Sequence, residues 1–227
     1  MKAPLKVGLM VPMNNTTLEG EMLAWLPKGS TCSTLRIPRG EGLLTSETLP
    51  AYKAQALSLA ARFASLDIDV VAYGCTAAGF ISGPAGDTQL ARELAEITGK
   101  PVVTTARSMV LALQESKARD IALVTPYLDA VNQQLKAFLS DGGIRVRRFN
   151  SFYAANVEEL GRIQSGAVAR LARETMDGEC DTLFVACAQL PTYDILDNLR
   201  REFGRPVLSS NWATTQQAIR ARKLQTA

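Results

Sequence analysis

Two cysteines, Cys75 and Cys187, lie at the ends of two short apolar segments of similar design. Residues 68–79 read IDVVAYGCTAAG and residues 181–192 read DTLFVACAQLPT. A near-continuous apolar run is typical of a parallel strand buried on both faces, and ligands bind beyond the carboxyl ends of such strands. A thiolate is a strong nucleophile, and its pKa falls at a helix N-terminus. The pattern therefore predicts two catalytic thiols facing one site.

The chain of 227 residues contains no histidine. This excludes the Ser-His-Asp triad, the Cys-His pair and His-ligated zinc, and leaves proton transfer to cysteine, carboxylate, lysine or tyrosine. A thiolate and a thiol on opposite sides of a carbon centre can carry a proton from one face to the other. Alternatively, one adds covalently while the other protonates. Neither route requires a cofactor, and we expect none.

The other two cysteines, Cys32 and Cys180, are interpreted as small buried apolar residues, which is the usual role of a free cysteine. The four cysteines form no C-x-x-C pair, so the sequence predicts no metal site. No dinucleotide fingerprint and no P-loop follows any apolar segment, which disfavours nicotinamide, flavin and nucleoside triphosphates.

Charge and hydropathy limit the partners of this chain. The net charge is only +3, and lysine and arginine are dispersed, so we expect no nucleic acid. No apolar run approaches the ~20 residues of a membrane span, so we expect no membrane partner. The sequence predicts a cytoplasmic globular protein that forms a homo-oligomer and acts on a small molecule.

Polar residues follow the first strand, at the same sheet edge as the cysteines. Asn14 and Asn15 precede two threonines, and their amides could hold a carboxylate together with helix N-terminal N–H groups. An ordinary helix N-cap would need only one of them. Tyr127 occupies the corresponding place in the second half of the chain, while Asn132 is interpreted as structural and Asn156 as a loop residue.

Apolar strands and amphipathic helices alternate along the chain, which predicts an α/β fold with parallel sheets and right-handed crossovers. Among the predicted strands are 6–11, 32–37, 102–104, 144–149 and 207–209. The predicted helices include 46–66, 88–98, 108–115, 157–176, 193–203 and 214–223, and Gly161 and Gly166 are expected as points where the helix 157–176 could break. A Gly/Pro-rich loop at 38–44, PRGEGLL, is a candidate lid, and SGPAGD at 82–87 is read as a helix-breaking cluster.

The second half of the chain repeats the order of the first, with a similar strand-proline-helix segment from residue 120 onward. Pro12 and Pro126 are 114 residues apart, and Cys75 and Cys187 are 112 residues apart. We interpret this as an internal duplication. It predicts two similar Rossmann-like lobes related by pseudo-two-fold symmetry, with the active site in the cleft between them. Residues 1–103 plus 207–227 would form the first lobe, and residues 104–206 the second.

This doubled fold, with a cysteine at matching strand ends, resembles the aspartate/glutamate racemase superfamily. VPMNNTTLEGE is similar to the opening motif of the maleate cis-trans isomerases. VTPYLDAVNQQLKAFL and VACAQLPT are similar to motifs that those isomerases share with the arylmalonate decarboxylases. The resemblance spans nearly the whole chain and is specific at these three motifs.

The resemblance implies that Cys75 adds to the double bond of maleate, so that the central bond can rotate. Cys187 would protonate the adduct and later deprotonate it. The groups implied to hold the substrate carboxylates are Asn15, Tyr127, Asn156 and backbone N–H groups near Thr76 and Ala188.

The first functional prediction is thus a cofactor-independent isomerase that converts maleate to fumarate. Two features leave alternatives open on the same scaffold. The segment TAAG after Cys75 is closer to the pattern of the racemases and decarboxylases than to that of the isomerases. The decarboxylases, however, keep only the second cysteine, so the presence of Cys75 argues against a decarboxylase. An amino-acid or hydantoin racemase and an arylmalonate-type decarboxylase therefore stay as alternatives. A non-catalytic protein that binds a small ligand by hinge closure is a further one.

Overall fold

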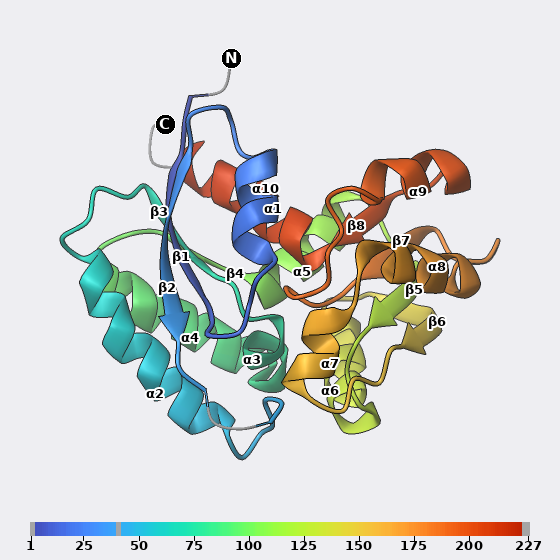
Figure 1. The fold of residues 1–227 in the computed structure, drawn as a ribbon, viewed down its shortest axis with the longest axis horizontal. Helices are drawn as coiled ribbons and strands as arrows, with labels where there is room; N and C mark the ends of the chain where they lie inside the picture. Colours follow the sequence, from blue (N-terminus) through green and yellow to red (C-terminus); the bar gives the residue numbers. More distant parts are fainter. Residues whose placement is uncertain (1–2, 40–41, 224–227) are drawn as a thin grey trace.

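The structure is a computed structural model that describes residues 3–39 and 42–223. Its strands form two parallel four-stranded sheets (Figure 1). The first sheet has the order β2-β1-β3-β4 and contains β1 (Lys6–Pro12), β2 (Thr31–Ile37), β3 (Val70–Tyr73) and β4 (Val102–Thr104). The second has the order β6-β5-β7-β8 and contains β5 (Asp120–Thr125), β6 (Arg145–Ser151), β7 (Thr182–Val185) and β8 (Val207–Ser209). The two sheets share one strand order, which confirms the predicted α/β fold of two similar lobes.

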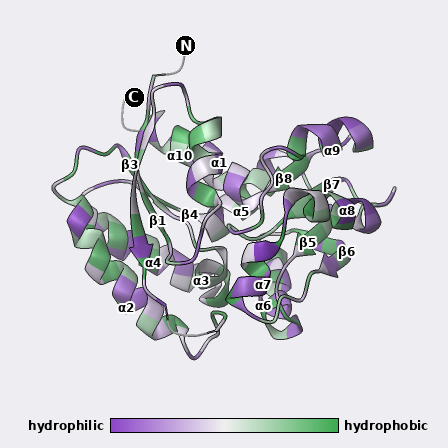
Figure 2. Cartoon of the chain, in the orientation of Figure 1, coloured by the Kyte–Doolittle hydropathy of each residue, from purple (hydrophilic) through white to green (hydrophobic). Residues whose placement is uncertain are grey.

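Helices cover both sheets. They are α1 (Leu18–Trp25), α2 (Leu49–Ala60), α3 (Thr76–Ile81), α4 (Gly83–Thr98), α5 (Thr105–Glu115), α6 (Asp129–Asp141), α7 (Val157–Arg162), α8 (Ser165–Thr175), α9 (Leu196–Phe203) and α10 (Ser210–Lys223), and a 3₁₀ turn, Ala61–Phe63, follows α2. The outer helix α9 is mostly hydrophilic and buries only Leu196 and Leu199 (Figure 2). Within the described ranges, no helix has the length and apolar character to cross a membrane.

Several helices begin or end a few residues from their predicted bounds, and two cases have a clear physical reason. The cluster SGPAGD does not break the chain, because α4 already begins at Gly83. Its proline occupies the first turn of the helix, where a missing N–H costs nothing. The predicted helix 157–176 is divided into α7 and α8, since Ile163 and Gln164 have extended backbones.

The lobe assignment of residues 207–209 is corrected by the structure. The sequence analysis placed this strand in the first lobe, but β8 pairs with β7 of the second sheet, with Phe184 opposite Leu208. The short connection from α9 returns the chain beside β7, as sequential elements in α/β folds usually do. The helix α10 then leads back and packs against α1, α5, β3 and β4 (Figure 1). The remaining lobe boundaries stay a prediction.

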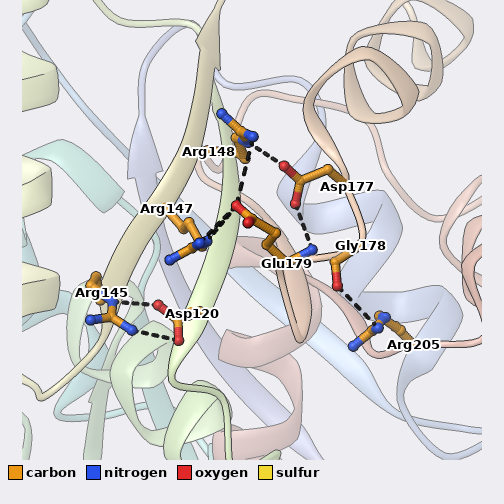
Figure 3. Close-up of polar contacts among 8 residues, drawn as sticks. All are labelled: Asp120, Arg145, Arg147, Arg148, Asp177, Gly178, Glu179 and Arg205. Carbon is orange, nitrogen blue, oxygen red and sulfur yellow. Dashed lines mark hydrogen bonds and ion pairs between the residues drawn. The ribbon is translucent and has the colours of Figure 1, made fainter.

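The edge strand β6 carries three arginines that are all paired with acidic side chains (Figure 3). Arg145, Arg147 and Arg148 contact Asp120, Glu179 and Asp177, respectively. Exposed ion pairs of this kind contribute only ~0–1 kcal/mol each. Charged side chains on a sheet edge do, however, oppose pairing with other strands. The pairs also balance the charge of the most basic strand.

Candidate active site

The cysteines Cys75 and Cys187 line the same cavity, which lies at the carboxyl ends of the strands of both sheets and has a volume of about 200 Å³. Pockets for drug-sized ligands are larger, ~300–1,000 Å³, so this cavity fits a small molecule. Its other lining residues are Pro12, Asn14, Asn15, Arg39, Leu43, Leu44, Thr45, Gly74, Thr76, Ala77, Tyr127, Leu128, Ala130, Val131, Leu160, Ala188 and Gln189. The cavity thus combines two thiols with neutral polar groups and aliphatic side chains.

Cys75 is held by a glycine turn and a helix start. It has an extended backbone, with φ −122° and ψ 98°, and it is the N-cap residue of α3. The preceding Gly74 passes so close to β1 that a Cβ there would lie 3.0 Å from the Met10 carbonyl oxygen. Because only glycine fits, the chain can turn sharply between β3 and α3 and direct Cys75 to the cavity.

Burial raises the pKa of the Cys75 thiol. Three kinds of group act in the opposite direction: the N–H of Ala78 in the first turn of α3, the hydroxyl of Tyr52 and the guanidinium of Arg39. Such donors and charges stabilise a thiolate. Of the two cysteines that line the cavity, Cys75 is therefore the one whose pKa is lowered by a neighbouring cation.

Cys187 has a strained backbone. Its φ is 152°, a region that side-chain-bearing residues rarely adopt and that costs ~1–3 kcal/mol. Its own N–H donates to Ser210 Oγ at 3.1 Å, and the N–H of Gln189 donates to Cys187 Sγ at 3.4 Å. Strain of this kind persists only where the surroundings hold the residue in place, and it is concentrated at functional sites.

Burial also raises the pKa of Cys187, while the N–H of Gln189 and the hydroxyl of Tyr127 lower it. A charge on Cys75 raises the pKa of Cys187 further. The two thiols are therefore coupled, and one thiolate favours a protonated partner. This is the protonation pattern that a nucleophile and a proton donor require.

Hydrogen bonds between the lobes fix the segment after Cys187. Asn15 Nδ2 donates to the Ala188 carbonyl oxygen at 2.9 Å, and the Ala188 N–H donates to Thr76 Oγ1 at 3.1 Å. Asn15 Oδ1 also accepts from the N–H of Leu18 at 3.0 Å. Of the residues predicted to bind substrate, Asn15, Thr76 and Ala188 are thus brought together at the cavity, and part of their bonding capacity joins the two lobes.

Tyr127 lines the cavity and is 6% exposed. Its hydroxyl is buried without a hydrogen-bond partner among the described residues, and it lies beside Cys187 and Thr76. Its carbonyl oxygen accepts from Asn132 Nδ2 at 2.7 Å, which confirms the structural role of Asn132. A buried hydroxyl without a partner is suited to donate to a bound ligand.

The structure places Asn14 at the cavity but leaves Asn156 away from it. Asn156 is exposed and caps α7, since its Oδ1 accepts from the Glu159 N–H at 2.9 Å. It is Leu160, one turn further along this helix, that lines the cavity. The loop interpretation of Asn156 describes this arrangement, in which its side chain does not line the cavity, and its contact with substrate stays a prediction.

The sequence analysis missed Arg39. Among the described residues that line the cavity, it alone carries a charge, and its guanidinium donates to Asn14 Oδ1 at 3.4 Å. It belongs to the predicted lid PRGEGLL, of which Gly40 and Glu41 lie outside the described residues. Leu43 and Leu44 of the same loop also line the cavity. The signal was the position of this loop directly after β2, next to β1 in the sheet.

Glu21 was also missed as a site-forming residue, because the helix dipole alone is enough to explain an acidic residue in the first turn of a helix. Its carboxylate is 8% exposed and reaches the second lobe. It accepts from the N–H groups of Thr192 and Tyr193, the latter at 2.7 Å, from Thr192 Oγ1 at 2.9 Å and from Asn211 Nδ2 at 2.7 Å. Since Thr192 ends the segment that begins at Cys187, Glu21 anchors that segment.

Comparison with known proteins agrees with the motifs. A model of the arylmalonate decarboxylase family matches residues 38–227. The chain is similar to the maleate isomerase of Nocardia farcinica, with 29% identity over 224 residues, 95% of this chain and 89% of that protein. It is also similar to the arylmalonate decarboxylase of Bordetella bronchiseptica, with 28% identity over 183 residues, 80% of this chain and 76% of that protein.

A solved structure gives the same result for the fold. The Nocardia farcinica maleate cis-trans isomerase, as a cysteine-to-serine variant with a covalently bound succinylcysteine intermediate, matches with a TM-score of 0.89 and 28% identity. The match covers 97% of this chain and 94% of that one. These findings confirm the resemblance stated from the sequence.

Proposed function

The chain belongs to the arylmalonate decarboxylase family, and we propose that it is a cofactor-independent isomerase that converts maleate to fumarate. The observation that carries the proposal is that Cys75 and Cys187, from different lobes, line one cavity of about 200 Å³. The similarity to maleate isomerases, one of which holds a succinylcysteine intermediate, supports covalent chemistry by a cysteine.

In the first step, the Cys75 thiolate forms a C–S bond to one olefinic carbon of maleate. The π electrons move to the other olefinic carbon and its carboxylate, and Cys187 Sγ delivers its proton to that carbon. The product is a succinyl thioether in which the central C–C bond is single and can rotate. Cys75 has the role of nucleophile because Arg39 and the first turn of α3 favour its thiolate.

The second step reverses the first after rotation. The Cys187 thiolate removes the proton from the same carbon, the double bond re-forms as the C–S bond breaks, and fumarate leaves with the Cys75 thiolate restored. Protons and electrons balance without any external acid, base or redox partner. Both thiols must therefore return to their resting protonation states in every turnover.

The carboxylates of the substrate are held by groups around the cavity. Tyr127, whose hydroxyl has no partner among the described residues, and Asn14 both line the cavity, and the Arg39 guanidinium supplies a positive charge. We include Asn15 and the N–H groups near Thr76 and Ala188, and we infer that Asn156 contacts substrate only if the loop before α7 moves inward.

A second candidate function is the decarboxylation of a malonate that carries a small apolar substituent. The aliphatic side chains of Leu43, Leu128, Val131 and Leu160 in the cavity lining support it. In that reaction Cys187 would protonate the carbanion left after loss of carbon dioxide, and Cys75 would not be needed. The requirement for Cys75 thus separates the two candidates.

The decisive experiment is proton NMR of the purified protein with maleate in heavy water, without added cofactor. We expect fumarate, with turnover lost in both Cys75→Ser and Cys187→Ala and retained in Cys32→Ser, whose thiol does not line the cavity. Unchanged maleate would contradict the proposal. Substituted malonates and amino acids, followed by release of carbon dioxide or by deuterium uptake at the α-carbon, would then test decarboxylation and racemisation. Cytoplasmic location and homo-oligomer formation stay predictions.

A further inference from the structure

Tyr52 is a buried tyrosine that the reaction described above does not use. It lies on α2 and is 4% exposed. Its hydroxyl is one of the few buried side-chain oxygens that have no hydrogen-bond partner in the described part of the chain. Buried polar groups in folded proteins are nearly always paired, so an unpaired hydroxyl calls for a functional explanation.

The neighbour of this hydroxyl is the thiol of Cys75. Both residues belong to one buried cluster of the first lobe, and the hydroxyl of Tyr52 is close enough to the sulfur to lower the pKa of Cys75. A neutral thiol is only a weak acceptor, whereas a thiolate accepts strongly. An ionised Cys75 would therefore offer the unpaired hydroxyl a strong acceptor.

The location of Tyr52 distinguishes it from Tyr127. Tyr127 follows β5 and lines the catalytic cavity, where it can meet a substrate. Tyr52 lies on α2 and lines a neighbouring cavity together with Arg39 and Leu44, but it does not line the catalytic one. A group placed there acts on the nucleophile and has no contact with substrate, so its effect should be visible in the free enzyme.

We propose that Tyr52 is a catalytic residue that donates a hydrogen bond from its hydroxyl to Cys75 Sγ and so stabilises the thiolate that attacks the substrate. The function of this thiolate rests on the proposed isomerase mechanism. The hydroxyl keeps its proton throughout, since burial raises the pKa of Tyr52 above its ordinary value. The thiol proton leaves to solvent. When the C–S bond breaks, sulfur regains its negative charge and again accepts a hydrogen bond from the same hydroxyl.

The ionisable and charged groups that influence or are influenced by Cys75 come from several elements. They are Tyr52 on α2, Arg39 after β2, Tyr73 on β3, Tyr127 after β5 and Cys187 after β7. Tyr73 provides a matched control. Its hydroxyl is also buried and unpaired, but it is not among the groups that lower the pKa of Cys75.

The test is the rate of iodoacetamide alkylation of Cys75 as a function of pH, read by mass spectrometry of the Cys75 peptide. We expect Tyr52→Phe to move the midpoint upward by about one pH unit, which is a tenfold smaller thiolate population at neutral pH, or ~1.4 kcal/mol. Tyr73→Phe should leave the midpoint unchanged. An unchanged midpoint in Tyr52→Phe, or an equal shift in both variants, would overturn the proposal.

The alkylation of Cys32 in the same samples serves as an internal reference, because this free thiol lies outside the cavity, whereas Cys187 is coupled to Cys75. Phenylalanine fills the space of the tyrosine ring, and if the substitution loosened the fold, both thiols would react faster. That outcome would also count against the proposal, which requires slower reaction at Cys75 alone. The experiment contains no substrate, so its result is independent of whether maleate is turned over. Failure of the isomerase assay and failure of the Tyr52 proposal are therefore distinguishable.

Discussion

Replacement of Glu21 by glutamine tests how the first lobe positions Cys187. In the native arrangement, Oε1 of Glu21 accepts from the N–H groups of Thr192 and Tyr193, and Oε2 accepts from Asn211 Nδ2 and the Thr192 hydroxyl. A glutamine can keep its oxygen on the two N–H groups. Its amide nitrogen then faces Asn211 Nδ2, so that two donors oppose each other.

The magnitude follows from this change of one partner. A hydrogen bond to a charged group contributes ~1.5–3 kcal/mol, and a buried donor left without an acceptor costs a similar amount. The Thr192 hydroxyl can rotate to accept from the new amide, so only the contact with Asn211 is lost. We expect Glu21→Gln to lower the free energy of unfolding by about 2 kcal/mol. For a chain of this size, that corresponds to a Tm lower by about 4–8 °C.

The assay is thermal and urea unfolding, together with the steady-state kinetics of maleate isomerisation. Because Glu21 anchors the segment after Cys187, we expect kcat to fall about tenfold while KM changes little. The control is Glu19→Gln on the same helix. The carboxylate of Glu19 is exposed and makes an ion pair with Arg36 at 3.5 Å, so this substitution should change the free energy of unfolding by less than ~0.5 kcal/mol.

A rescue variant makes the reasoning refutable. Adding Asn211→Asp to Glu21→Gln turns the opposed donor into an acceptor and should recover part of the lost stability. The hydrogen-bond argument would be wrong if Glu21→Gln were as stable as the native protein. It would also be wrong if the double variant lost as much stability as the two single variants together.

Three other outcomes are expected. Cys187→Gly should be more stable than Cys187→Ala by about 1–2 kcal/mol in urea unfolding, because glycine relieves the positive φ. Gly79→Ala should destabilise by about 1–3 kcal/mol, since its Cβ would lie 2.7 Å from a buried carboxylate oxygen, whereas Gly20→Ala, with no atom within 4 Å, should not. Turnover should rise with pH as the Cys75 thiolate forms, because burial raises the pKa of Cys75. Arg39→Gln removes a cation that lowers this pKa, so it should move the rise to higher pH and increase KM for maleate, as measured by pH-rate profiles.

The repeating pattern along the chain was sufficient to predict the general architecture. Continuous apolar segments before Cys75 and Cys187 indicated buried parallel strands, and both are fully buried as β3 and β7. The lobe of β8 was not predictable in this way, because a three-residue strand carries no information on its pairing partner. Asn156 illustrates the same limit, since a loop asparagine can cap a helix or face a ligand, and here it caps α7.

By itself, the sequence determined the reactive groups of this protein. The sequence contains two thiols at the ends of equivalent apolar segments and no imidazole, and this excludes mechanisms that depend on histidine in any fold. Only the tertiary structure decided which groups surround each thiol. Tyr52 and Arg39 are 23 and 36 residues from Cys75 in the sequence, and Glu21 is 171 residues from Thr192. Whether residues so far apart in sequence lie close in space depends on sheet order and helix packing. The pKa of a thiol depends on charges and donors within a few ångströms, so the function of each cysteine was set by these long-range contacts.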